Sequence, residues 1–216
     1  MIERKKFFDA IRSSPFPGSL TPGQVDGINR VLDEWERRKL TDLRWLAYML
    51  ATTFHETAHT MQPIAEYGKG KGRRYGEPSA NGHTYYGRGF VQLTWQANYQ
   101  KMSDLLEVDL VNNPDRAMEP KIATKILFVG MLLGTFTNKK LANYFGPGVS
   151  DWVGARRIIN GIDRAQEIGT IARKFYAALL ASKSASAPNA DIEPPKPRMS
   201  WLDRLLNAIG ASRRKG

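Results

Sequence analysis

Residue types that could hydrolyse a bond gather in the stretch FHETAHT, at residues 54–60. On a helix, His55 and His59 would lie one turn apart and could bind one zinc ion, with Glu56 as the general base. Alternatively, Glu56 acts as a carboxylic acid by itself, and the histidines hydrogen-bond their neighbours and orient the site. The two hypotheses predict different reactions, and the rest of the chain must decide between them.

The zinc hypothesis needs a third protein ligand, because catalytic zinc sites usually have three. Gln62 and Ala65 occupy the positions where an extended zinc-peptidase motif would have glycine and histidine. Glu77 and His83 are the remaining candidates, and no second helix is expected to present them. We therefore predict no metal and no other cofactor, and keep an H-E-x-x-H zinc-dependent peptidase as a further alternative.

A glycine-rich segment follows, with seven glycines among aromatic and basic residues between residues 62 and 89. Its length and composition predict a long functional loop over a cleft. The basic part, GKGKGRR at residues 68–74, could contact phosphates, but it lacks the G-K-[S/T] ending of a P-loop. Since no nucleic-acid-binding module is apparent either, we expect no nucleic-acid partner.

Helices are expected to hold these segments in place. Thr21, Pro22 and Gln24 predict a capped helix start, after a short first helix around residues 7–11. An apolar stripe predicts a long third helix over about residues 41–61, with Glu56 in its last turns and off the stripe. Further helices are expected within residues 94–108, 119–134, 150–158 and 163–180. The predicted fold class is therefore mainly α.

The composition predicts one folded domain with a basic surface. The chain has 216 residues, a formal charge of +11 and no cysteine, which excludes disulfides and thiolate metal sites. Its charge should attract polyanions such as nucleic acid, anionic lipid or bacterial envelope polymers. The longest apolar run, residues 126–136, is too short to cross a bilayer, and the N-terminus lacks a signal-peptide pattern. We expect synthesis and folding in the cytoplasm.

The last part of the chain differs in composition. Residues 183–199 are rich in proline and predict a linker after a domain at residues 1–182. Residues 200–216 have large apolar residues on one face and trailing basic residues, which predicts a basic amphipathic helix. That helix would contact an anionic membrane or lipopolysaccharide, or would instead fold back on the first domain.

Three blocks in order, FHETAH, YYGRGFVQLTWQANY and IINGI, resemble the catalytic core of glycoside hydrolase family 19. This family contains plant-type chitinases and many phage endolysins. The resemblance covers residues 43–180, with residues 1–40 as helical scaffold. It implies a lysozyme-like helical fold with two lobes around a substrate cleft, and inverting hydrolysis of β-1,4 glycosidic bonds.

The resemblance also implies roles for individual residues. Glu56 would be the general acid, and Glu66 the preferred general base, with Glu77 as the alternative. The two carboxyl groups of an inverting enzyme should lie about 6.5–9.5 Å apart. The remaining matches would bind substrate: Tyr86, Gln92, Thr94, Asn98, Asn160 and Arg173, with Arg164 as a rival to Arg173. Thr94 could instead cap the next helix, and Asn160 could simply form a turn.

The substrate is either peptidoglycan or a chitin-type glycan. The basic charge, the lack of a signal peptide and the basic C-terminal segment favour a phage endolysin that cleaves peptidoglycan glycan strands. Such an enzyme would be a monomer that stays in the host cytoplasm. It would reach the cell wall in the periplasm after a holin opens the membrane. A chitinase acting on chitin is the alternative.

Overall fold

The computed structural model describes residues 2–183, and these residues contain six α-helices. The first three are α1 (Arg4–Ser13), α2 (Pro22–Arg37) and α3 (Leu43–Glu56). The last three are α4 (Gln96–Leu106), α5 (Pro120–Leu133) and α6 (Ala165–Ala181). The predicted linker and C-terminal helix, residues 183–199 and 200–216, lie outside the described residues except for Lys183.

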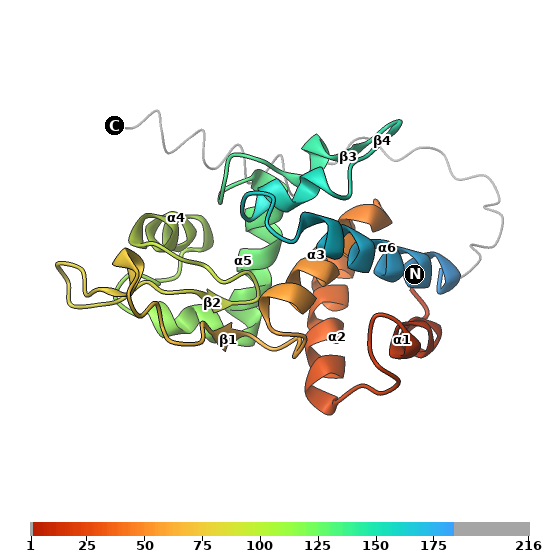
Figure 1. The fold of residues 1–216 in the computed structure, drawn as a ribbon, viewed down its shortest axis with the longest axis horizontal. Helices are drawn as coiled ribbons and strands as arrows, with labels where there is room; N and C mark the ends of the chain where they lie inside the picture. Colours follow the sequence, from red (N-terminus) through yellow and green to blue (C-terminus); the bar gives the residue numbers. More distant parts are fainter. Residues whose placement is uncertain (1, 184–216) are drawn as a thin grey trace. The chain divides into compact units, whose positions relative to one another are not determined.

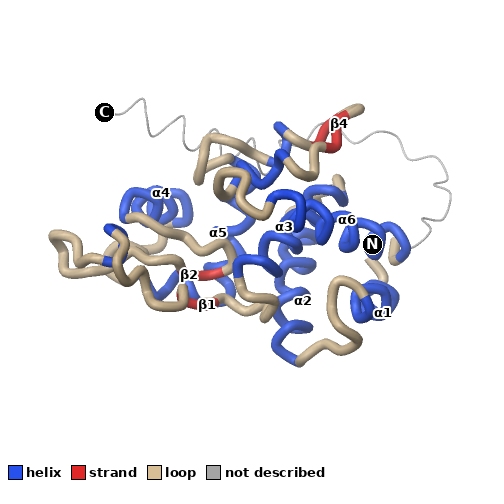
Figure 2. The backbone as a smooth tube through the Cα atoms, in the orientation of Figure 1, coloured by secondary structure: helices blue, strands red, loops and turns tan. Residues whose placement is uncertain are grey.

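Short strands and 3₁₀-helices connect the α-helices (Figure 2). Strands β1 (Ile64–Ala65) and β2 (Arg88–Gly89) form one antiparallel pair, in which Ile64 lies opposite Gly89. Strands β3 (Phe145–Gly146) and β4 (Val149–Ser150) form the other. The 3₁₀-helices are η1 (Arg74–Gly76), η2 (Pro114–Met118), η3 (Leu141–Asn143) and η4 (Gly154–Ile158).

Helices α3 and α5 lie at the centre of the part formed by residues 2–183 (Figure 1). In α3 every residue from Leu46 to Phe54 is buried, and in α5 nearly every residue from Ile122 to Leu132 is buried. A helix that is apolar on all sides is a core helix. Helix α3 packs most extensively against α6, and also contacts α2 and α5. Its C-terminal end is therefore held rigidly from several directions.

Helices α2 and α3 each begin directly after a residue whose side chain caps the helix. The Thr21 hydroxyl accepts a hydrogen bond from the Gln24 backbone N–H, and the Gln24 side chain accepts one from the Thr21 N–H, which confirms the predicted capping box of α2. The Asp42 carboxylate caps α3 by accepting from the Arg44 N–H. None of the helices within residues 2–183 is long and apolar enough to cross a membrane.

The predicted end of the third helix was wrong, because α3 ends at Glu56 rather than near Met61. The Thr57 hydroxyl donates to the Thr53 carbonyl and accepts from the Met61 N–H, which replaces helical bonding with a tight turn. Ala58, His59 and Met61 have positive φ values, a conformation outside the right-handed helix. Residues 150–158 likewise contain only the end of a hairpin and a 3₁₀-helix.

The turn after α3 is fixed to α2. The Gln24 side chain donates to the His59 carbonyl at 3.0 Å, and the Gln62 side chain donates to the Gly23 carbonyl at 2.5 Å. Gly27 permits the close approach, since a Cβ atom there would lie 1.7 Å from the Met61 carbonyl oxygen. The chain that leaves α3 is thereby directed towards β1 and the glycine-rich segment.

Candidate active site

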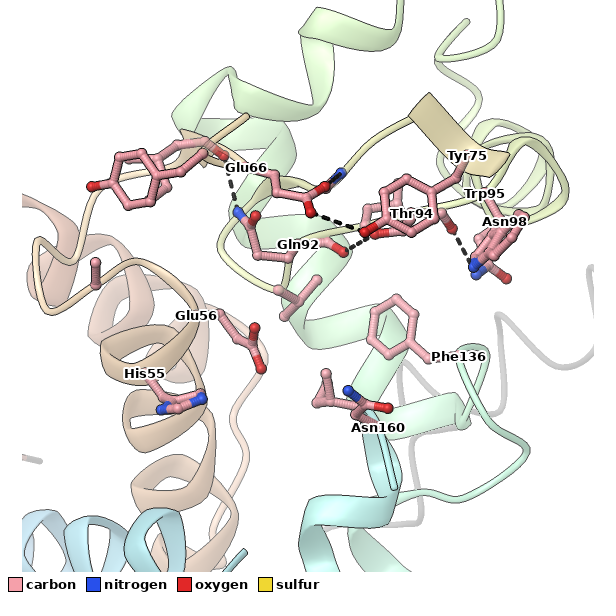
Figure 3. Close-up of a pocket in the computed structure, with 17 residues that line it drawn as sticks. His55, Glu56, Glu66, Tyr75, Gln92, Thr94, Trp95, Asn98, Phe136 and Asn160 are labelled. Atoms are coloured by element: carbon pink, nitrogen blue, oxygen red, sulfur yellow. Dashed lines mark hydrogen bonds between the residues drawn. The ribbon is translucent and has the colours of Figure 1, made fainter. Parts of the chain in front are cut away.

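A cavity of 710 Å³ lies between the end of α3, the β1–β2 region, the start of α4 and the loop after η4 (Figure 3). It brings together six of the residues singled out in the sequence, which are Glu56, Glu66, Gln92, Thr94, Asn98 and Asn160. These six come from segments that are far apart in the chain. Glu56 and Glu66 are the only acidic residues among the seventeen that line it.

Glu56 is the last residue of α3, and its side chain is only 14% exposed. Its Oε1 atom pairs with Nη1 of Arg156 at 2.5 Å, and the Arg156 Nε donates to the Asp163 carbonyl at 3.2 Å. Within residues 2–183, Oε2 of Glu56 accepts no hydrogen bond. The rigid helix and the buried arginine therefore fix one oxygen of Glu56 and leave the other available to a ligand.

His55 and His59 point to different places. His55 lines the cavity beside Glu56, and burial lowers its pKa, which favours the neutral imidazole. His59 lies beyond the helix end, stacks on the Phe54 ring at 4.0 Å and lines a different cavity. Because the two histidines do not share a helical face, the geometry required by the zinc-peptidase alternative is absent. Residues 2–183 also contain no group of three histidine, aspartate or glutamate side chains suited to a metal.

Glu66 directly follows β1, and both of its carboxylate oxygens accept hydrogen bonds. The Tyr75 hydroxyl donates to Oε1 at 2.9 Å, and the Gly87 N–H donates to Oε2 at 3.1 Å. The Glu66 N–H donates to the Gly87 carbonyl at 2.7 Å, which continues the β1–β2 pairing by one residue. Desolvation and the bond to Glu66 raise the pKa of Tyr75. These contacts hold the Glu66 carboxylate in one orientation in the cavity wall.

The polar wall at the start of α4 is held by its own hydrogen bonds. The Gln92 amide donates to the carbonyls of Ile64 and Gly89, so it joins β1 to β2. The Thr94 hydroxyl donates to the Gln92 carbonyl, and the Asn98 amide donates to the Thr94 carbonyl. Trp95, not Thr94, occupies the N-cap position of α4, and no side chain caps this helix by a hydrogen bond. The suggestion that Thr94 caps the helix was therefore wrong.

Aromatic side chains line the same cavity. Tyr67 is 79% exposed and Trp95 is 49% exposed, and the Trp95 ring meets Tyr75 edge to face at 5.3 Å. Phe136 and Asn160 lie on the other side (Figure 3). Exposed aromatic faces beside amide and hydroxyl groups can bind rings whose faces are apolar and whose edges are polar, as sugar rings are.

Three predicted residues and one rival candidate do not line the cavity. Glu77 is exposed and follows η1, so it lies apart from Glu56. Tyr86 is buried, and its ring packs under the Arg88 guanidinium at 3.6 Å. Arg173 is exposed on α6 over the Trp152 ring, and its rival Arg164 pairs with Glu167. None of these four side chains lines the cavity, and their assigned roles stay predictions.

The sequence reading missed Arg156, the buried partner of Glu56. Arg156 is 4% exposed and lies in η4, next to the fully buried residues Ala155 and Ile158. The signal in the sequence that could have indicated Arg156 is a charged residue within an apolar segment. A charge that is buried there needs a partner. Its partner is 100 positions earlier in the chain, a separation that no local pattern reveals.

The middle of the chain matches a family model. Residues 41–139 match the model described as "Chitinase class I" (Glyco_hydro_19). The chain is similar to the "Acidic endochitinase" of Petunia hybrida, with 38% identity over 105 residues, which cover 48% of this chain and 35% of that protein. It is also similar to "Endochitinase 1" of Theobroma cacao, with 48% identity over 52 residues, covering 24% and 16%. The chain thus spans about a third or less of the length of these relatives.

Solved structures share the fold. Chitinase C from Streptomyces griseus HUT6037 has a TM-score of 0.56 at 19% identity, covering 87% of this chain and 79% of that one. A bacterial family 19 chitinase has a TM-score of 0.51 at 23% identity, covering 82% and 94%. The predicted fold class, mainly α and lysozyme-like, is confirmed by this similarity and by the helical structure itself.

Proposed function

We propose that the chain, whose residues 41–139 match the model of glycoside hydrolase family 19, hydrolyses β-1,4 glycosidic bonds as a member of that family, by an inverting acid/base mechanism. The observation that carries the proposal is the pair of carboxylates, Glu56 and Glu66, in the wall of one cavity. Inverting glycoside hydrolysis requires one carboxylic acid and one carboxylate, on opposite sides of the bond that is cleaved.

In the proposed reaction, Glu56 binds the substrate in its protonated form, and its Oε2–H donates the proton to the glycosidic oxygen. The carboxylate that remains is the form that pairs with Arg156. Glu66 accepts a proton from a water molecule, which attacks the anomeric carbon from the other face of the sugar. The glycosidic C–O bond breaks as the new C–O bond forms, so the anomeric configuration inverts. Tyr75 and Gly87 support this role because their hydrogen bonds fix the orientation of the base. Glu77 is the less suitable base, since it lies outside the cavity.

Aromatic and polar side chains position the glycan in this proposal. Trp95 and Tyr75 would stack on sugar rings, and Asn98 and Asn160 would bind hydroxyl or acetamido groups. One N–H of the Asn98 amide is used by the Thr94 carbonyl, so its Oδ1 and its second N–H are available for a ligand. Gln92 has a supporting role, because its amide nitrogen joins β1 to β2.

For the natural substrate, we propose the glycan strand of bacterial peptidoglycan, cleaved by the chain as an endolysin. The formal charge of +11 supports this choice, since a basic protein is attracted to the anionic bacterial envelope. Chitin is the second candidate, and the plant relatives named as endochitinases favour it. Access to the wall through a holin remains part of the endolysin proposal.

The test is digestion of purified Gram-negative sacculi and of chitin oligomers, with new reducing ends and product masses as readouts. Glu56→Gln and Glu66→Gln should each lower the rate by about 10²–10⁴-fold, the usual contribution of a general acid or base. Nuclear magnetic resonance should show that a β-linked oligomer first yields the α-anomer. If Glu77→Gln abolishes hydrolysis and Glu66→Gln does not, the assignment of the base is wrong. If the wild type cleaves neither glycan, the proposed function fails.

A further inference from the structure

The glycine-rich segment carries four cations between two residues of the cavity wall. Lys69, Lys71, Arg73 and Arg74 are all exposed, and residues 68–74 contain no acidic residue, so their net charge is +4. We refer to residues 68–74 as the basic loop. Tyr67, directly before the basic loop, and Tyr75, directly after it, both line the cavity. Both ends of the loop are therefore anchored at the site, and its cations are close in sequence to two residues of the cavity wall.

The basic loop is folded by its own backbone bonds. The N–H groups of Lys69, Lys71 and Arg73 donate to the carbonyls of Glu66, Gly68 and Gly70 at 2.9–3.0 Å. The loop closes where Gly70 meets Gly76, since a Cβ atom on Gly76 would lie 2.1 Å from the Gly70 carbonyl oxygen. A loop closed in this way holds its side chains in a limited region, which lowers the entropy lost when a ligand is bound.

The four cations have no acidic partner in the part of the chain that the structure describes. None of them forms an ion pair with residues 2–183. Two carboxylates flank the loop in the sequence: Glu66 is already engaged by Tyr75 and Gly87, and the exposed Glu77 forms no ion pair within residues 2–183. Four like charges on one short loop repel one another, so an external anion would relieve this repulsion. The loop therefore carries unused positive charge beside the cavity.

The cavity itself has the opposite character. Its seventeen described lining residues include Glu56 and Glu66 but no lysine or arginine. A polyphosphate backbone running through the cavity would be repelled by these two carboxylates. A suitable ligand is neutral along the part that enters the cavity and acidic on a branch that reaches the rim. A glycan with carboxylate-bearing side branches has this charge pattern, and an unbranched neutral glycan lacks it.

We propose that the basic loop is a subsite that binds the carboxylates on the branches of an acidic glycan strand, such as the peptide-substituted strand of peptidoglycan, bound in the neighbouring cavity. This inference rests on the proposed function, because it assumes that a glycan occupies the cavity. It assigns part of the selectivity for an acidic glycan over a neutral one to residues other than Glu56 and Glu66. Exposed charge pairs contribute little individually, so the effect should come from several cations together and should weaken as salt is added.

The experiment compares Lys69→Gln/Lys71→Gln with a control of equal charge loss, Lys121→Gln/Lys174→Gln, whose exposed lysines lie outside this cavity. The substrates are native sacculi, sacculi whose carboxylates have been amidated, and neutral chitin oligomers. The loop variant should raise KM for native sacculi by about 3- to 30-fold at low salt. Its effect on amidated sacculi and on chitin oligomers should be much smaller. The control variant should change KM for none of the three substrates.

Equal effects of the loop variant on native and amidated sacculi would overturn the subsite, and so would equal effects of the two double variants. Sedimentation of each protein in the Glu56→Gln background with native and amidated sacculi gives the same comparison without hydrolysis. This binding measurement tests the subsite even if the wild type hydrolyses no glycan. Failure of the proposed function can therefore be distinguished from failure of the subsite. Loss of DNA binding in the loop variant with unchanged binding to sacculi would reassign the loop to nucleic acid.

Discussion

The ion pair between Glu56 and Arg156 should contribute measurably to stability, and Arg156→Met tests this contribution. Removing one partner of a buried ion pair costs about 3–5 kcal/mol, because the other charge is left without compensation. Glu56 keeps some contact with the cavity, with 14% of its side chain exposed. We therefore expect a loss at or just below the lower end of this range, about 2–3 kcal/mol in the free energy of unfolding.

The double variant isolates the interaction itself. Glu56→Gln alone should cost about 1–2 kcal/mol, since Arg156 then loses its charged partner. With both changes no uncompensated charge remains, so the double variant should lose only about 2–3 kcal/mol, which is less than the sum of the single losses. The measurement is urea unfolding at pH 7, followed by tryptophan fluorescence and circular dichroism, with equal slopes as the check on two-state behaviour.

The neighbouring residue is the control. Arg157 is exposed and forms no ion pair within residues 2–183, so Arg157→Met should change the free energy of unfolding by less than about 0.5 kcal/mol. Losses that add to within about 0.5 kcal/mol in the double variant would refute the coupling between Glu56 and Arg156. A loss in Arg157→Met as large as that in Arg156→Met would refute the assignment to this ion pair.

Three further predictions concern other parts of the site and its support. Burial lowers the pKa of His55 below its value in the unfolded chain. The stability that comes from its neutral form is therefore present above about pH 6.5 and is lost as the pH falls towards the folded pKa. Urea unfolding from pH 8 to pH 5 should show a smaller decline in the free energy of unfolding for His55→Gln than for the wild type. Gly27→Ala should lower the free energy of unfolding by about 1–3 kcal/mol, because its Cβ would lie 1.7 Å from the Met61 carbonyl oxygen. Gly23→Ala in the same helix has its nearest atom at 3.5 Å and should be neutral or stabilising, so equal losses would contradict this reasoning. Trp95→Ala should raise KM for the glycan about tenfold with little change in stability, since the ring is 49% exposed in the cavity; an unchanged KM would show that the ring does not stack on substrate.

The sequence predicted the helices well where local signals are strong. The capping box at Thr21 and the apolar stripe of the third helix are local features, and both correspond to observed helix starts. The end of α3 was missed because the turn there depends on contacts with α2, which lie more than thirty positions away. The apolar stripe continues to Met61 because Met61 is buried, although it is no longer helical.

The same distinction applies to the site. The motif blocks contain Glu56 and the polar wall around Gln92, and the family resemblance favoured Glu66 over Glu77 as the base. The structure brings Glu56, Glu66 and Gln92 to one cavity. The pairing of Glu66 with Gly87 and of Glu56 with Arg156 depends on tertiary packing, so no local pattern specifies it. Arg173, which the resemblance assigned to substrate binding, is exposed on α6 over the Trp152 ring, so its role stays a prediction.

The positive φ values of Gln92 (+51°) and Trp95 (+75°) have a consequence for engineering. Non-glycine residues in this region cost about 1–3 kcal/mol each, so a search for thermostable variants would test glycine at both positions, although glycine at position 92 also removes the hydrogen bonds that join β1 to β2. Either replacement would relax the backbone and delete a side chain from the cavity wall. At these positions a more heat-resistant protein would be a poorer ligand-binding protein, and selection for stability alone would remove part of the site.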